Sequence, residues 1–318
     1  MISFVRVFIV LAAVVMAGSA QADPSVWKRI WPNTDFEKHS VDYDTILWGG
    51  VPKDGIRSIE NPKFFPASQV TDLTPTDPVI GVIINGEAKA YPLSVLTRHE
   101  IANDMVGGVP VAVTYCPLCN SAVVFDRRVS GRVLEFGVSG NLRNSDMVMY
   151  DRQTESWWQQ FLGEGIVGEM TGTTLKTIPS RLESFANFKT RAANGRVMDA
   201  RGYGTNPYAY YDTRNVPYGF FRGPWPNGIE PMVHVVVVEG EAWSLPLLAS
   251  AGKLTHKDLV FTWTEGQNSA LDSSRISEGR DVGNVIVKRK SDGKDVTYDV
   301  TFAFVYHAFH PDGVIHKE

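Results

Sequence analysis

The only two cysteines of the 318-residue chain lie three positions apart, as Cys116 and Cys119 in the segment VTYCPLCNSAVVF. Two thiolates at this spacing can form a labile redox couple or bind one soft metal ion, such as copper or zinc. A disulfide between them would close a loop of about four residues, which the chain-entropy model credits with at most about 2 kcal/mol. We therefore expect redox or metal chemistry here, and the alternative is a disulfide that only clips the turn.

The residues around the pair make the prediction more specific. Pro117 suits the first position of a helical turn, which would place Cys116 at a cap where free amides lower the pKa of its thiol. Cys116 is then the more exposed, attacking sulfur and Cys119 its resolving partner. A thioredoxin-like site is excluded because strand-forming residues, rather than a long helix, follow the pair. With no third cysteine, a metal would need histidine, methionine or carboxylate ligands in addition.

Histidines supply the first candidates for such ligands. His99 follows a predicted helix and precedes the strand that delivers the cysteines, so it is the preferred further ligand, with His310 or Met149 behind it. In VYHAFHPD, a strand would place His307 and His310 on opposite faces, so that only one points inward. Hydrolysis by His99 with its neighbour Glu100 is disfavoured because the chain carries no recognisable nucleophile motif.

A second group of polar residues suggests a different function. Arg143, Ser145 and Asp146 lie in a dense polar loop that runs into a strand. They could line a pocket for a small molecule, and the protein would then be a binding module whose cysteines are merely structural.

The N-terminus predicts export. Residues 1–22 combine a charged end, an apolar run and the small-residue pattern Ala20-Gln21-Ala22, which is typical of a cleaved signal peptide. We expect a periplasmic or secreted protein with no stable membrane insertion after cleavage. Loss of Arg6 leaves 30 basic against 35 acidic side chains, which disfavours nucleic acid as a partner. Expected partners are a small molecule, a metal ion or a periplasmic redox protein.

Part of the chain is repeated without its cysteines. The segment 77–93, with its Asn85-Gly86 turn, aligns with 230–247. The alignment continues to the cysteine segment, where Thr264 and Gln267 stand in the positions of the two cysteines. A duplicated unit that lacks them indicates that the turn does not need sulfur to fold. The pattern predicts a β-rich α+β protein with short helices and two related β-sheet units from an internal duplication. The expected boundaries are an arm at 23–70, units at 71–160 and 226–318, and a connection rich in Gly, Tyr and Pro at 161–225.

Three long motifs carry a family resemblance. RHEIANDMVGGVPVAVTYCPLCNSAVVFDR, SGNLRNSDMVMYDRQTESWWQQ and AFHPD closely resemble the bacterial family known as domain of unknown function 3179. The resemblance covers about residues 40 to 313 and implies an exported protein of this architecture, without a settled reaction. The matching positions with polar or sulfur chemistry are His99, Glu100, Cys116, Cys119, Arg143, Ser145, Asp146 and His310, and Pro117 also matches. Asn120 and Arg98 depart from the pattern, where glycine and tryptophan are expected.

Overall fold

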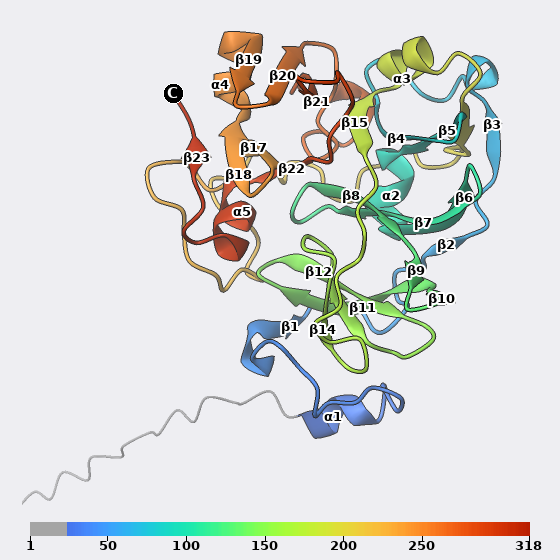
Figure 1. Cartoon of the computed structure of the whole chain (residues 1–318), viewed down its shortest axis with the longest axis vertical. Coiled ribbons are helices and arrows are strands. Elements are labelled where there is room, and N and C mark those ends of the chain that lie inside the picture. Colours follow the sequence, from blue (N-terminus) through green and yellow to red (C-terminus); the bar gives the residue numbers. More distant parts are fainter. Residues whose placement is uncertain (1–23) are drawn as a thin grey trace, which may run out of the picture.

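The computed structural model describes residues 24–318, so the predicted signal peptide lies outside the described part of the chain. Strands hold 38% of the residues and helices 14%, and the fold is therefore β-rich with few short helices, as expected. Five main sheets follow one another in a propeller-like ring (Figure 1). Two separate sheet units are not apparent in this ring.

Three sheets come from the first two thirds of the chain, and each is named here by one of its strands. The β12 sheet has the order β1 (Ile46–Trp48), β11 (Phe136–Arg143), β12 (Asp146–Asp151), β13 (Trp157–Gln159) and β14 (Glu164–Val167). The β7 sheet has the order β2 (Ile59–Glu60), β6 (Ile101–Val106), β7 (Val109–Cys116) and β8 (Ser121–Asp126). The β4 sheet has the order β15 (Ser180–Ser184), β4 (Pro78–Ile84), β5 (Glu87–Pro92), β16 (Arg196–Met198) and β3 (Phe64–Pro66).

Two further sheets and one hairpin complete the strands. The β17 sheet has the order β22 (Asp299–Phe302), β17 (His234–Val238), β18 (Glu241–Ser244) and β23 (Ile315–His316). The β20 sheet has the order β19 (Lys253–His256), β20 (Leu259–Thr264) and β21 (Asn284–Arg289). The small hairpin pairs β9 (Arg128–Val129) with β10 (Arg132–Val133).

The helices are all short and connect strands. They are α1 (Pro24–Lys28), α2 (Leu93–His99), α3 (Phe185–Arg191), α4 (Leu245–Ala251) and α5 (Ala303–Phe309), with 3-10 turns at Tyr43–Thr45, Ala67–Gln69 and Ile276–Glu278. Helix α5 contradicts the predicted strand around His307 and His310: the apolar run after Phe302 is buried on a helix, and His310 follows its last turn. No helix among residues 24–318 is long and apolar enough to cross a membrane.

The cysteine-bearing strand lies in the centre of the core. β7 is buried along nearly its whole length, because its side chains are small or apolar on both faces, as in a strand covered on both sides. It pairs antiparallel with β6 and β8. The two cysteines therefore lie at the end of a buried strand.

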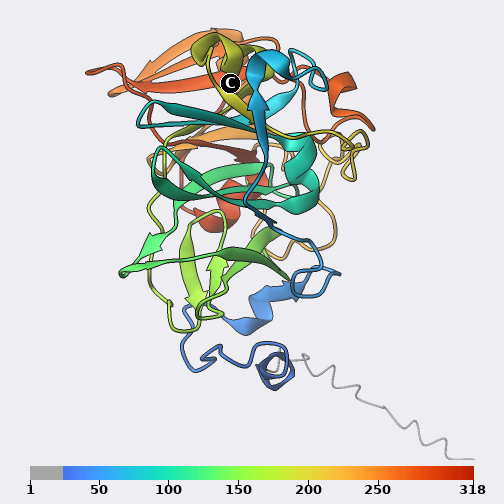
Figure 2. The same cartoon turned by 90° about the vertical axis from the view of Figure 1, so that its right-hand side faces the viewer.

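The segment 24–70 is an integral part of several sheets. Its strands β1, β2 and β3 pair with β11, β6 and β16, so the segment ties three sheets together. In Figure 2 it runs along one side of the molecule, from the lower sheet to the top.

Candidate functional site

The two cysteines lie in the turn of the β7–β8 hairpin. Cys116 is the last residue of β7 and pairs with Ser121, and the Cys119 amide donates to the Cys116 carbonyl over 3.2 Å. The Asn120 amide likewise donates to the Pro117 carbonyl at 3.3 Å, so the chain makes a single tight turn after Cys116 and then returns into β8. Asn120 has a φ of 54°, which is left-handed and explains why glycine suits this position.

Contacts from distant segments fix this turn. The Cys119 carbonyl accepts from the Thr301 hydroxyl at 2.8 Å and from the Phe302 amide at 3.2 Å. The Tyr211 hydroxyl, from the segment rich in Gly, Tyr and Pro, donates to the Leu118 carbonyl at 2.9 Å. The carboxylate of Asp299 accepts from the Ala122 amide at 2.8 Å and from the Ser121 hydroxyl. The positions of both sulfurs are consequently set by tertiary structure.

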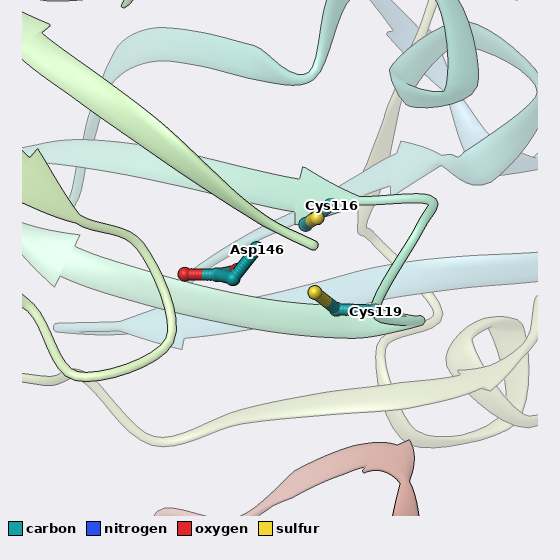
Figure 3. Close-up of side chains that lie close together, drawn as sticks. All are labelled: Cys116, Cys119 and Asp146. Carbon is teal, nitrogen blue, oxygen red and sulfur yellow. The ribbon is translucent and has the colours of Figure 1, made fainter. Parts of the chain in front are cut away.

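A second hairpin brings a carboxylate to the sulfurs (Figure 3). β11 and β12 are joined by Asn144 and Ser145, whose φ values of 54° and 66° are those of a tight two-residue hairpin turn. The predicted polar loop is thus a β-hairpin. The Ser145 carbonyl lies 3.8 Å from the sulfur of Cys116 and 3.4 Å from that of Cys119. Asp146 follows at once, and one ligand atom from each of the two cysteines and Asp146 lies within 4.8 Å of the others.

The two oxygens of Asp146 have different surroundings. Oδ2 accepts from the Phe161 amide at 2.9 Å and from the side-chain amide of Gln159 at 2.5 Å. Oδ1 is buried without a hydrogen-bond partner, and so is the hydroxyl of Ser145. One carboxylate oxygen therefore holds the side chain in place, and the Cys119 thiol also interacts with the carboxylate, which offsets part of the rise in the pKa of Asp146 that burial causes.

Glu100 lies beside this group. It ends helix α2 with φ 60° and ψ −33°, a conformation that is uncommon for a residue other than glycine. Its carbonyl accepts from the Tyr115 amide at 2.8 Å, next to Cys116. The side chain is buried, and among residues 24–318 no lysine, arginine or histidine forms an ion pair with it.

Burial raises the pKa of every acidic group in the site. It raises the pKa of Asp146 to about 6, and burial together with the Asp146 charge raises the pKa of Glu100 to about 8. The pKa values of the Cys116 and Cys119 thiols are also raised, by burial first. The predicted activated thiolate is therefore wrong, as is the greater exposure of Cys116, because both sulfurs are buried.

Arg143 lies close to the site without pairing with Asp146 directly. It donates to the Thr45 hydroxyl at 3.2 Å and to the Gln159 side-chain oxygen at 3.4 Å, and its guanidinium lies 5.5 Å from the Phe309 ring centroid. Gln159 thus bridges Arg143 and Asp146. Burial lowers the pKa of the guanidinium.

The two predicted histidine ligands are held elsewhere. His99 Nδ1 lies 2.7 Å from the Arg57 carbonyl, and Nε2 lies 2.9 Å from the Tyr203 hydroxyl. His310 packs against Tyr306 and Phe161, and burial lowers the pKa of its ring. Neither belongs to the group that surrounds the sulfurs.

A cavity of about 480 Å³ opens in another part of the molecule. Its lining includes Arg214, His234, Trp263 and Arg280, and it does not include Arg143 or Asp146. The small-molecule pocket predicted around Arg143 does not coincide with this cavity.

Two residues of the site, Gln159 and Asp299, have no signal in the sequence, because only the fold brings β13 and β22 to the two hairpins. The sequence predicts Asp146 in a ligand pocket, whereas the structure places it beside the sulfurs. The alternation in DMVMYD after Asn-Ser indicates a hairpin, and it could have shown that Asp146 starts a strand.

Comparison with known families places the chain in one of them. Residues 53–313 match the family described as "Protein of unknown function (DUF3179)". The chain belongs to this family. Comparisons with curated proteins and with solved structures gave no match.

Proposed function

We propose that the protein handles a soft or borderline metal ion, Zn²⁺ or Cu(I), through Cys116, Cys119 and Asp146. The observation that carries the proposal is that the two thiols and the Asp146 carboxylate each have a ligand atom within 4.8 Å of the others in the protein interior, and that Asp146 Oδ1 has no hydrogen-bond partner. Buried polar atoms in native proteins nearly always have a partner. A metal ion would supply one for Asp146 Oδ1.

The charge of the site supports a cation. Four acidic groups lie together, and burial is the first cause that raises the pKa of each. Bound metals require deprotonated thiols and compensate for that charge. The set of two sulfurs and one oxygen favours Zn²⁺, whereas a purely sulfur set would favour Cu(I).

The backbone conformation of Glu100 is one that glycine adopts more easily than glutamate. At the matching position of α4, Gly252 has φ 62° and ψ −43°, close to the values of Glu100. A non-glycine residue there stores strain of about 1–3 kcal/mol, which is often found at functional sites. We assign Glu100 an electrostatic role, because its carboxyl group interacts with that of Asp146 and with the Cys116 thiol.

A thiol redox function is less well supported. Disulfide exchange needs access to a sulfur and a substantial fraction of thiolate. Both sulfurs are buried with raised pKa values, which disfavours attack on a protein partner.

We also propose that the fold arose by internal duplication. The β4 and β17 sheets share a strand order, in which β15-β4-β5-β16 corresponds to β22-β17-β18-β23 with the same relative orientations. In both, a seven-residue helix and a hairpin follow: α2 with β6–β7, and α4 with β19–β20. The second hairpin has no cysteines, which supports a chemical role for the pair in the first. The signal-like pattern of residues 1–22 supports function outside the cytoplasm.

Metal titration of the full chain tests the proposal. The reduced, metal-free protein should take up Zn²⁺, and Co²⁺ should give a thiolate-to-cobalt absorption band. Asp146→Asn keeps an oxygen for the Gln159 and Phe161 contacts but replaces the free oxygen by an amide nitrogen. It should weaken Zn²⁺ binding at least tenfold, and Cys116→Ser should abolish the cobalt band.

Asp292→Asn, on an exposed turn, is the matched control and should leave binding unchanged. Absence of the thiolate band in the reduced protein would refute the metal site. If the thiols then equilibrated readily with glutathione buffers, the redox function would replace it.

A further inference from the structure

Two imidazoles and a carboxylate meet at the edge of the β17 sheet that lies away from the cysteine turn. Glu241 is the first residue of β18, His256 the last of β19 and His316 the last of β23. The Nε2 atom of His316 lies 2.7 Å from Glu241 Oε2, and that of His256 lies 3.5 Å from the same oxygen. One ligand atom from each residue lies within 4.8 Å of the others.

The rings are oriented by packing. Trp243 stacks on His316 with centroids 4.7 Å apart and an interplanar angle of 15°. The same indole meets His256 edge to face at 5.4 Å. The parallel pairing of β23 with β18 places His316 opposite Trp243. Both Nε2 atoms are thereby directed at one carboxylate oxygen.

The hydrogen bonds of the cluster leave it incomplete. Lys257 holds Glu241 Oε1 at 2.6 Å, so that Oε2 faces the imidazoles. His256 Nε2 is buried without a hydrogen-bond partner. A buried nitrogen in that state costs about 1–3 kcal/mol, and a cation between the three groups would remove this penalty.

We propose that Glu241, His256 and His316 form a second metal site, which takes a divalent transition-metal ion of the Zn²⁺ class. Two imidazoles and one carboxylate are a donor set that suits Zn²⁺ and leaves a fourth position for water or a ligand. The three side chains are 26–30% exposed, so this position is reachable from solvent.

The second site differs from the first in chemistry and in place. It contains no sulfur, and β22, which contacts the cysteine turn, lies at the opposite edge of the same sheet. His316 also lies outside the segment 53–313 that matches the family. The second site therefore does not depend on the function proposed for the cysteines.

The test uses the full chain with Cys116→Ser and Cys119→Ser, which removes the sulfur ligands. At about pH 7.5, where free imidazoles are mostly neutral, this variant should bind one Zn²⁺ in competition with a chromophoric indicator. Adding His316→Ala should weaken binding at least tenfold. His316 lies on a two-residue edge strand, so the substitution leaves the core intact, and urea unfolding would verify this.

His39→Ala is the matched control, because His39 is exposed and its ring lies against the Val41 carbonyl and the Tyr43 ring, away from the cluster; it should leave Zn²⁺ affinity unchanged. In the chain with both cysteines, His316→Ala should remove one bound Zn²⁺ and leave the thiolate-to-cobalt band intact. Zn²⁺ binding that His316→Ala does not alter, or no uptake by the cysteine-free variant, would overturn the second site.

Discussion

The substitution Glu100→Gln tests the electrostatics of the buried acidic cluster. The folded protein raises the pKa of Glu100 from 4.5 to about 8, so the folded state holds its proton more tightly than the unfolded chain does. This stability is fully present below the unfolded pKa and is lost as the pH rises through the folded pKa. The full shift corresponds to about 5 kcal/mol, most of which is lost between pH 5 and pH 8. Glutamine is neutral throughout and should not show this loss.

Urea unfolding of the reduced, metal-free protein measures the effect. Wild type and Glu100→Gln should have similar free energies of unfolding at about pH 5, and at about pH 8 the variant should be more stable by about 3 kcal/mol. In a chain of this size the corresponding difference in Tm is roughly 5–10 °C. Glu265→Gln is the control, since Glu265 is exposed and should follow wild type. Parallel pH profiles for wild type and Glu100→Gln would refute the reasoning, because they would show that Glu100 is ionised in the folded state.

Two further predictions concern the same interior. Because burial raises the pKa of both thiols, Zn²⁺ should displace two protons when it binds. Its apparent affinity should then rise roughly 100-fold per pH unit above about pH 6. Calorimetry in buffers of different ionisation enthalpy measures the proton release, and an affinity that does not change with pH would contradict the prediction. Asp151 is fully buried and accepts from the Thr154 amide at 2.7 Å and the Trp158 indole at 2.9 Å. Asp151→Ala should lower the free energy of unfolding, measured in urea, by about 2–5 kcal/mol. A change within about 0.5 kcal/mol, the size expected for a surface substitution such as Asp292→Asn, would contradict this prediction.

The pattern of apolar residues in the sequence was sufficient to predict the strands on either side of the cysteines. The run from Val109 to Cys116 is apolar on both faces, and the residues from Ser121 onward return as a strand, so a buried hairpin could be predicted. The length of the turn within it could not be predicted. Pro117 is compatible with the start of a longer helix and with a single tight turn, and pairing of Cys116 with Ser121 limits the segment to a single turn.

The environment of the thiols depends on contacts that are distant in sequence. An isolated turn would leave Cys116 exposed, whereas β22, Tyr211 and the β11–β12 hairpin cover it in the folded chain. The same packing reverses the direction of the predicted pKa shift, because burial outweighs any effect of the local amides. The α5 helix shows the same limit: AFVYHAF is a short apolar run that fits a buried strand as well as a helix, and its residues 303–306 are buried in a helix.

The comparison of Glu100 with Gly252 connects these observations. Both residues end a seven-residue helix with nearly the same left-handed backbone, and both precede a hairpin strand. Glycine adopts that conformation without strain, so the backbone alone would favour glycine at both positions. At position 100 the chain instead carries a strained residue whose carboxyl group is buried beside two thiols and Asp146, where its pKa is raised to about 8. Each of these features lowers the stability of the metal-free fold, and a bound cation would offset the electrostatic ones together. Proteins often sacrifice stability in this way at sites that act on a ligand.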